Sequence, residues 1–297
     1  MRFFVTGASG FVGSAVVADL LEAGHQVLGL ARSESAAHRV AGLGAEVWRG
    51  SLDEPERLRA AASTADGVIH LGYHHDFSQY ELAAELDRQA IEVFGQVLAG
   101  SGRPLVVTSG MAGLAPDQVL TEDVAAPAAM PRASERAVFA FADRGVRASA
   151  VRLAPTVHGP GDHGFVPALI DTARRHGVSA YPGDGSNRWP AVHRLDAAPL
   201  FRLAAEQAPA GTVLHAVAED GIPVRDIAEA IGQGLALPVE SVPADTLAQR
   251  AGFIGHVFGL DLPASSALTR QRFGWQPRHP GLLADLARPD YFAPAAA

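Results

Sequence analysis

The sequence predicts an α/β protein with a doubly wound parallel sheet and a smaller C-terminal subdomain. Three observations predict this architecture: strand-like and helix-like segments alternate six times over the first half, a glycine-rich turn joins the first strand to the first helix, and the pattern becomes irregular after Leu153. Parallel strands need crossover connections, so this alternation favours a parallel sheet with helices on both faces.

The strands of the first half are short apolar runs, and the helices carry apolar residues every three or four positions. The first helix begins at Phe11 and ends before Gly24, because glycine adopts positive φ without strain. The expected strands are residues 2–6, 26–30, 45–48, 66–71, 104–108 and 147–153, and the later helices are residues 33–43, 54–62, 78–99 and 131–144.

The second half is rich in Pro, Gly and His at its start. We expect a loop at 154–164, a helix at 165–176, a Gly/Pro-rich segment at 181–190, a strand edge plus helix at 192–207, a strand at 212–217, and helices and loops from Ile222. The predicted division is a large domain of residues 1–154, to which 191–218 return, and a smaller substrate-binding subdomain of 155–190 and 219–297.

Composition excludes several classes of protein. The 297 residues are 48% hydrophobic and 19% charged, with a net charge of −8 and no basic cluster, which argues against a nucleic-acid partner. The absence of cysteine excludes disulfides, thiolate metal sites and a cysteine nucleophile. With no apparent signal peptide and no apolar stretch of about 18 residues, we expect a cytoplasmic protein that does not enter membranes.

The glycine-rich turn predicts a Rossmann-type dinucleotide site. Gly7 permits the tight turn, Gly10 lets the backbone approach a pyrophosphate, and Gly13 allows the helix to pack on the strand. The helix N-terminus adds free N–H groups and a positive dipole end. The expected pyrophosphate-binding residues are Thr6, Gly7, Ser9, Gly10, Phe11, Val12 and Gly13.

The end of the second strand predicts NADP. An acidic residue there would bind a ribose 2′-hydroxyl, but the strand ends Leu30-Ala31-Arg32-Ser33. Arg32 can pair with a 2′-phosphate and Ser33 can donate to it. The alternative is that Arg32 is a solvated surface residue, and NAD stays possible. Ser51 and Leu52 follow the third strand, where the adenine is expected.

Further segments resemble the extended short-chain dehydrogenases/reductases, the group of sugar epimerases, dehydratases and dihydroflavonol-type reductases. The matching residues, in family order, are 6–13, 68–72, 106–109, 122–123, 151–153 with Pro155, 157–161 and 192–196. The resemblance implies a nicotinamide cofactor flanked by Leu71, Gly72, Thr108, Pro155 and Val157, and a homodimer formed through the helices at 78–99 and 131–144.

The resemblance breaks at the catalytic signature. The family places a serine after the fifth strand and then Tyr-x-x-x-Lys, in which the tyrosine transfers a proton and the lysine lowers its pKa. Ser109 matches the serine, but Pro127 occupies the tyrosine position and Pro131 the lysine position. The chain therefore resembles an atypical branch of the family that lacks the usual proton donor.

We expect a proton donor that replaces the tyrosine to lie at the carboxyl edge of the sheet, where open α/β sheets bind ligands. Tyr73-His74-His75-Asp76 follows the fourth strand, so His75, oriented by Asp76, is a candidate acid; the alternative is a solvated or helix-capping loop. His158 is a second candidate, with packing as its alternative. The histidine spacings do not favour a metal site.

These inferences predict an NAD(P)-dependent oxidoreductase that moves hydride between the nicotinamide and a carbonyl or imine carbon of a small organic molecule. An iminium substrate is already protonated and needs less from an enzymic acid. The alternatives are a sugar-nucleotide epimerase or dehydratase, and a catalytically silent dinucleotide-binding sensor.

Overall fold

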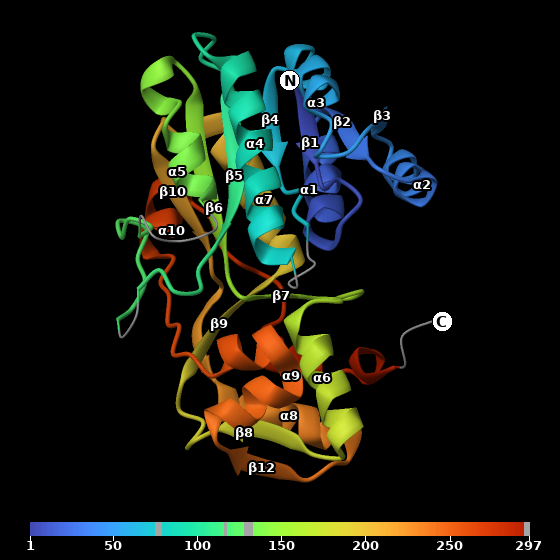
Figure 1. Ribbon diagram of the computed structural model, residues 1–297, viewed down its shortest axis with the longest axis vertical. Helices are drawn as coiled ribbons and strands as arrows, with labels where there is room; N and C mark the ends of the chain where they lie inside the picture. Colours follow the sequence, from blue (N-terminus) through green and yellow to red (C-terminus); the bar gives the residue numbers. More distant parts are fainter. Residues whose placement is uncertain (75–78, 116–117, 128–132, 294–297) are drawn as a thin grey trace.

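The central feature of the protein is a parallel sheet. The computed structural model describes residues 1–74, 79–115, 118–127 and 133–293, and in these residues seven parallel strands lie in the order β10-β6-β5-β4-β1-β2-β3 (Figure 1). The strands are β1 (Arg2–Thr6), β2 (Gln26–Ala31), β3 (Glu46–Arg49), β4 (Gly67–His70), β5 (Pro104–Gly110), β6 (Arg147–Leu153) and β10 (Thr212–Ala216). The predicted fold class is confirmed.

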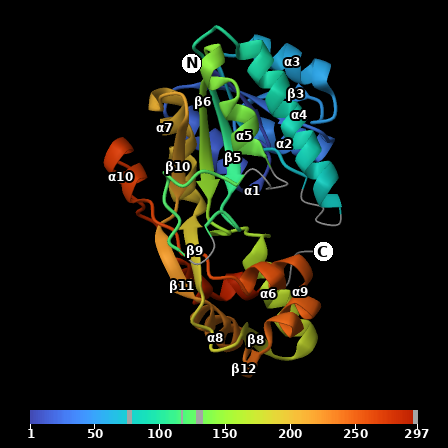
Figure 2. The same cartoon turned by 60° about the vertical axis from the view of Figure 1, so that its left-hand side comes forward.

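Helices cover both faces because side chains alternate along each strand. On β1, Phe3 and Val5 enter one apolar core and Phe4 the other. The first core is covered by α1 (Phe11–Glu22), α2 (Glu34–Gly42) and α7 (Arg194–Gln207), and the second by α3 (Pro55–Ser63), α4 (Tyr80–Leu98) and α5 (Ser134–Phe139). Figure 2 shows α7 and α4 on opposite sides of β5 and β6.

The strand order reverses between β1 and β4. From β1 the chain proceeds outward to β2 and β3, and then returns to β4 on the other side of β1. In open α/β sheets, the carboxyl ends of the strands at such a reversal diverge and leave room for a ligand. The glycine-rich turn after β1 lies at this position.

The second part of the chain packs against the carboxyl edge of the sheet (Figure 1). β7 (Thr156–His158), β9 (Arg188–His193) and β11 (Glu219–Pro223) form one small sheet, and β8 (Ser179–Pro182) pairs with β12 (Val239–Val242). Trp189 is fully buried and its Nε1 donates to Thr156 Oγ1 at 2.7 Å. The helices are α6 (Phe165–His176), α8 (Val224–Leu235), α9 (Ala244–Phe258), α10 (Ala267–Phe273) and α11 (Leu282–Leu286), followed by the 3₁₀ turn η3 (Pro289–Phe292).

Several segments differ from the sequence prediction, which gave no strands where β8, β11 and β12 lie. The loop expected at 154–164 contains β7, which pairs with β9, where Thr156 lies opposite Ala191. The helix expected at 131–144 is shorter, because α5 ends at Phe139 and a 3₁₀ turn, η2 (Ala142–Arg144), leads to Gly145 in the left-handed region. The predicted domain boundaries stay a prediction. No helix of the described residues is long and apolar enough to cross a bilayer.

A cluster of histidines joins the two parts. His158 Nδ1 lies 2.7 Å from Asp285 Oδ2, and His193 Nε2 lies 3.9 Å from the same oxygen. His193 also stacks on His279 and accepts a hydrogen bond from the Leu195 N–H, which caps α7. Burial lowers the pKa of His193 to about 4, and His158 adds to this effect while Asp285 opposes it.

This cluster predicts acid sensitivity. The pKa of His193 falls from its ordinary value of 6.5 to about 4 on folding, so the unfolded chain binds the proton first as the pH decreases. The stability contributed by neutral His193 is present above pH 6.5 and is lost as the pH falls toward 4.

The variant His193→Asn retains a side-chain acceptor for the cap and does not titrate. Urea unfolding at several pH values should give a smaller loss of unfolding free energy between pH 6.5 and 4 for this variant than for the natural protein. Measurements above pH 7 provide the packing control, because both residues are then neutral. Parallel pH profiles would contradict the prediction.

Candidate functional site

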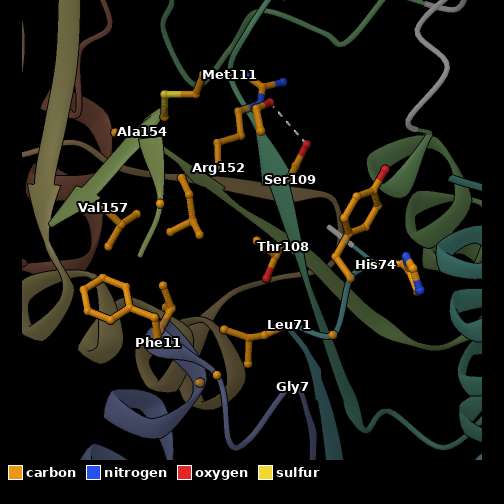
Figure 3. A pocket seen from close by; sticks show the side chains of 18 of the residues that line it. Gly7, Phe11, Leu71, His74, Thr108, Ser109, Met111, Arg152, Ala154 and Val157 are labelled. Carbon is orange, nitrogen blue, oxygen red and sulfur yellow. Dashed lines mark hydrogen bonds between the residues drawn. The ribbon is translucent and has the colours of Figure 1, made fainter. Parts of the chain in front are cut away.

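A pocket of about 1930 Å³ opens at the carboxyl edge of the large sheet. Its walls come from the glycine-rich turn, the ends of β2, β4 and β5, and the segment from β7 to α6. Figure 3 shows Thr108 and Ser109 on β5, with Phe11 and Val157 at one edge and His74 at the opposite edge. The pocket therefore spans the strand-order reversal and reaches the second part of the chain.

The glycine-rich turn is packed too closely for side chains. Gly7 has a φ of +68°, and a Cβ at this residue would lie 2.8 Å from the Gly72 nitrogen. A Cβ at Gly13 would lie 2.0 Å from the Gly7 carbonyl oxygen. Helix α1 starts with Gly10 as its N-cap and has no side-chain cap and no acidic residue in its first turn. The turn thus presents an uncapped helix N-terminus to the pocket, which suits an anion.

The Thr6 side chain connects the glycine-rich turn to strand β4 and to Gly72, which follows that strand. Its hydroxyl accepts from the Gly72 N–H at 2.9 Å and contacts His70 Nδ1 at 2.6 Å, inside the protein. His70 Nε2 in turn lies 3.3 Å from Asp87 on α4. Thr6 is fully buried and is not among the pocket-lining residues, so its side chain joins the turn to β4.

The end of β2 and the start of α2 bring two arginines and two serines to the pocket. Arg32, Ser33, Ser35 and Arg39 all line it. Ser33 Oγ accepts from the Ala36 N–H and caps α2. Ser35 and Arg39 are four residues apart on α2 and so share a helix face, a spacing from which the sequence could have added them to the site.

Glu34 lies beside these residues but does not add negative charge to the pocket. Its carboxylate pairs with Arg49 on β3, and this hydrogen bond lowers the pKa of Glu34 and keeps it ionised. Glu34 is not among the lining residues. The lining of this end of the pocket therefore has two guanidinium groups, several hydroxyl groups and one carboxylate, Asp53, whose pKa is lowered by its hydrogen bond with Ser51.

The middle of the pocket is mostly apolar around one serine. Ser109 Oγ makes a long contact of 3.5 Å to the Gly110 carbonyl oxygen, so its hydroxyl is weakly held (Figure 3). Along β7, alternation turns Val157 into the pocket and His158 away from it. Other lining residues here are Leu71, Gly72, Thr108, Met111 and Pro155.

A buried guanidinium forms the wall beyond Ser109. Arg152 on β6 is fully buried, and its Nε and one terminal nitrogen each donate to Glu135 on α5 at 2.8 Å. It also donates to the carbonyl oxygens of Thr121 and Val124 and lies 3.2 Å from His215 Nε2. Because the charge is paired on all sides, Arg152 is a fixed part of the wall.

Most predicted cofactor residues meet at this pocket. Those that line it are Gly7, Ser9, Gly10, Phe11, Val12, Gly13, Arg32, Ser33, Ser51, Leu52, Leu71, Gly72, Thr108, Pro155 and Val157. Of the proposed catalytic residues, Ser109 lines the pocket, His75 and Asp76 lie outside the described residues, and His158 is fully buried against Asp285 and does not line it. Catalytic roles for His75, Asp76 and His158 stay predictions.

The pocket lining contains titratable groups, among them His74, Glu122, Asp123, Asp162 and His163, but not the tyrosine–lysine pair of the resemblance. Pro127, at the tyrosine position of the resemblance, lines it, and the sequence contains no lysine at all. Among the described lining residues Tyr73 is the one tyrosine, next to His74 after β4. The described residues contain no group of three or more metal-ligating side chains.

The fold and the glycine-rich turn define a nicotinamide-dinucleotide protein of the Rossmann type. Residues 3–216 match the model of the NAD dependent epimerase/dehydratase family. The chain belongs to this family, as its resemblance to the extended short-chain dehydrogenases/reductases implied.

Relatives of known sequence or structure agree with this assignment. An uncharacterised protein of Schizosaccharomyces pombe is 49% identical over 98% of this chain and 100% of its own length. A 2-alkyl-3-oxoalkanoate reductase of Stenotrophomonas maltophilia is 33% identical over 69% of this chain and 66% of its own. A dTDP-glucose 4,6-dehydratase of Streptomyces venezuelae, solved with NAD, shares the fold with a TM-score of 0.78 at 20% identity, covering 98% and 96% of the two chains.

The close packing at Gly13 gives a sharp test of the cofactor turn. In Gly13→Ala the new methyl must displace the Gly7 carbonyl, so we expect the affinity for reduced nicotinamide dinucleotides to fall roughly 10- to 100-fold. Titration followed by the fluorescence of the reduced cofactor measures the change. Gly42→Ala is the matched control, since a Cβ there meets nothing within 4 Å. Equal affinities for both variants would contradict the assignment of the turn.

Proposed function

We propose that the protein is an NADP(H)-dependent reductase that delivers hydride to a carbonyl or imine carbon of a small organic substrate. The observation that carries this proposal is the continuity of one pocket from Arg32 and Arg39, past the glycine-rich turn, to Ser109. A dinucleotide extended along this path has its adenosine end at β2 and its nicotinamide end near β5.

The preference for NADP(H) rests on charge at the adenosine end. Arg32 and Arg39 offer guanidinium groups, and Ser33 and Ser35 offer hydroxyls, to a ribose 2′-phosphate. The nearby carboxylate of Glu34 is paired with Arg49 and so does not compete for the 2′-hydroxyl. Asp53 is the one carboxylate that lines this end, and a 2′-phosphate would add further negative charge that the two guanidinium groups can bind.

The chemistry at the other end needs few protein groups. When bound, the reduced cofactor supplies a hydride from its nicotinamide C4 to the electrophilic carbon, and the C=O or C=N π electrons move to the heteroatom. Ser109 donates a hydrogen bond to that heteroatom, and the segment Tyr73–Asp76 after β4 supplies its proton. Tyr73 and His74 line the pocket, which supports this assignment for the segment.

Reduction is favoured over the alternatives by the missing tyrosine and lysine. Sugar-nucleotide epimerases and dehydratases resembling this chain depend on that pair, whereas an iminium ion arrives already protonated. The Stenotrophomonas relative is named as a reductase of a keto compound, which also supports reduction. The absence of the pair equally fits a silent dinucleotide binder, so turnover must decide.

The deciding experiment combines purified protein with NADPH and a panel of ketones and cyclic imines, and follows the absorbance of the reduced cofactor. We expect turnover above background with at least one substrate, and a loss of turnover in Ser109→Ala. Tight NADPH binding without turnover across the panel would favour the silent binder and overturn the proposal.

The cofactor preference predicts a selective effect of the adenosine-end arginines. A charge-assisted hydrogen bond contributes about 1.5–3 kcal/mol, so Arg32→Ala or Arg39→Ala should weaken NADPH binding about 10- to 100-fold and leave NADH binding nearly unchanged. Isothermal titration of both cofactors measures this ratio. Arg59→Ala, on the outer side of α3, is the control. Equal losses for NADPH and NADH would count against a 2′-phosphate site.

A further inference from the structure

Arg194 contacts the cofactor turn from a distant part of the chain. It is the first residue of α7, directly after β9, and its guanidinium carbon lies 5.0 Å from the centre of the Phe11 ring. Phe11 is the first residue of α1, in the glycine-rich turn, and the His163 ring packs edge-on against it at 5.7 Å. Arg194, Phe11 and His163 all line the pocket.

The charge of Arg194 has no partner within the described part of the chain. Its Nε is buried without a hydrogen-bond acceptor, and no ion pair involves this residue. Two other arginines that line the pocket differ, since Arg152 is paired with Glu135 and Arg272 lies 3.7 Å from Asp123. A guanidinium has five N–H donors. A half-buried cation without a partner is unfavourable unless a ligand accepts these hydrogen bonds and balances the charge.

The contact with the Phe11 ring positions the guanidinium but does not provide acceptors for its N–H groups. A cation over a phenyl ring gains about 0.5–2 kcal/mol, and its N–H groups remain free at the edge of the stack. The ring therefore fixes Arg194 beside the first turn of α1. This is the place where the helix N-terminus is uncapped by any side chain.

The charge balance at this point favours a phosphate ligand. A dinucleotide pyrophosphate carries two negative charges, whereas a helix N-terminus supplies the equivalent of only about half a positive charge. The first turn of α1 contains no basic residue. A full positive charge beside the turn would balance the rest of the negative charge of the pyrophosphate.

We propose that Arg194 binds the pyrophosphate of the dinucleotide, held in place by the face of Phe11. This inference rests on the proposed cofactor, and it adds a residue that the glycine-rich turn does not reveal. Because Arg194 follows β9 directly, the small sheet of the second part then contributes to cofactor binding.

The test compares the binding of ligands that contain the pyrophosphate with the binding of a ligand that lacks it. Isothermal titration of Arg194→Gln, Arg194→Lys and the natural protein uses three probes: NADPH, NADH and adenosine 2′-monophosphate, which lacks both phosphates of the pyrophosphate. For Arg194→Gln we expect both NADPH and NADH to bind about 10- to 100-fold more weakly, and the monophosphate to bind with nearly unchanged affinity. Retained monophosphate binding also shows that the variant is folded. Arg194→Lys should recover part of the loss, since it keeps the charge but not the fork of donors.

Arg272→Gln is the matched control, because Arg272 lines the same pocket but already faces a carboxylate, and its affinities should equal those of the natural protein. Unchanged dinucleotide affinity in Arg194→Gln would overturn the inference. So would a rise in substrate KM with cofactor affinity intact, which would assign Arg194 to an anionic substrate group. Failure of the natural protein to bind any nicotinamide dinucleotide would instead overturn the proposed function.

Discussion

The pairing of one buried guanidinium holds the far wall of the pocket together. Arg152 has no exposed surface, and removing its partner would leave an uncompensated charge at a cost of about 3–5 kcal/mol. Glu135 on α5 satisfies it from one side, and the Thr121 and Val124 carbonyl oxygens from another. Strand β6, helix α5 and the chain that passes Pro127 are therefore fixed relative to one another by this one residue.

The network extends from Arg152 to the C-terminal part of the chain. His215 on β10 lies next to the guanidinium, and its backbone N–H donates to Thr269 on α10. Thr269 in turn donates to Glu122, which lines the pocket. Burial lowers the pKa of His215 to about 4, so it is neutral near pH 7 and its Nε2 can accept from Arg152. The wall of the site is thus held by ion pairs and hydrogen bonds on the side where the resemblance places the tyrosine. In the function that we propose, the proton comes from the segment after β4.

The sequence predicted the parts of the fold that local pattern determines. The bounds of β1, β6 and α6 agree with the predicted segments, because each is a continuous apolar or amphipathic run with a clear stop. β7 was missed because it is three residues long and exists through pairing with β9. The same holds for the site: the glycine-rich turn is local in sequence, whereas Arg194 reaches Phe11 only through the fold. His158 could not be judged from its neighbours, since Asp285, which holds it, is 127 residues away.

The chain contains 24 basic residues and no lysine, so all of them are arginines. A guanidinium stays protonated at any pH at which the protein is folded, and it binds phosphate oxygens through a planar fork of donors. Arginines at the pocket can bind negative charge but do not exchange a proton near neutral pH. In the family's Tyr-x-x-x-Lys arrangement these two tasks are coupled in one pair of residues. In the function that we propose they are separated: permanent cations bind the cofactor, and a hydroxyl, imidazole or carboxyl group transfers the proton. A substrate that needs little proton transfer, such as an iminium ion, is the kind that such a site can reduce most readily.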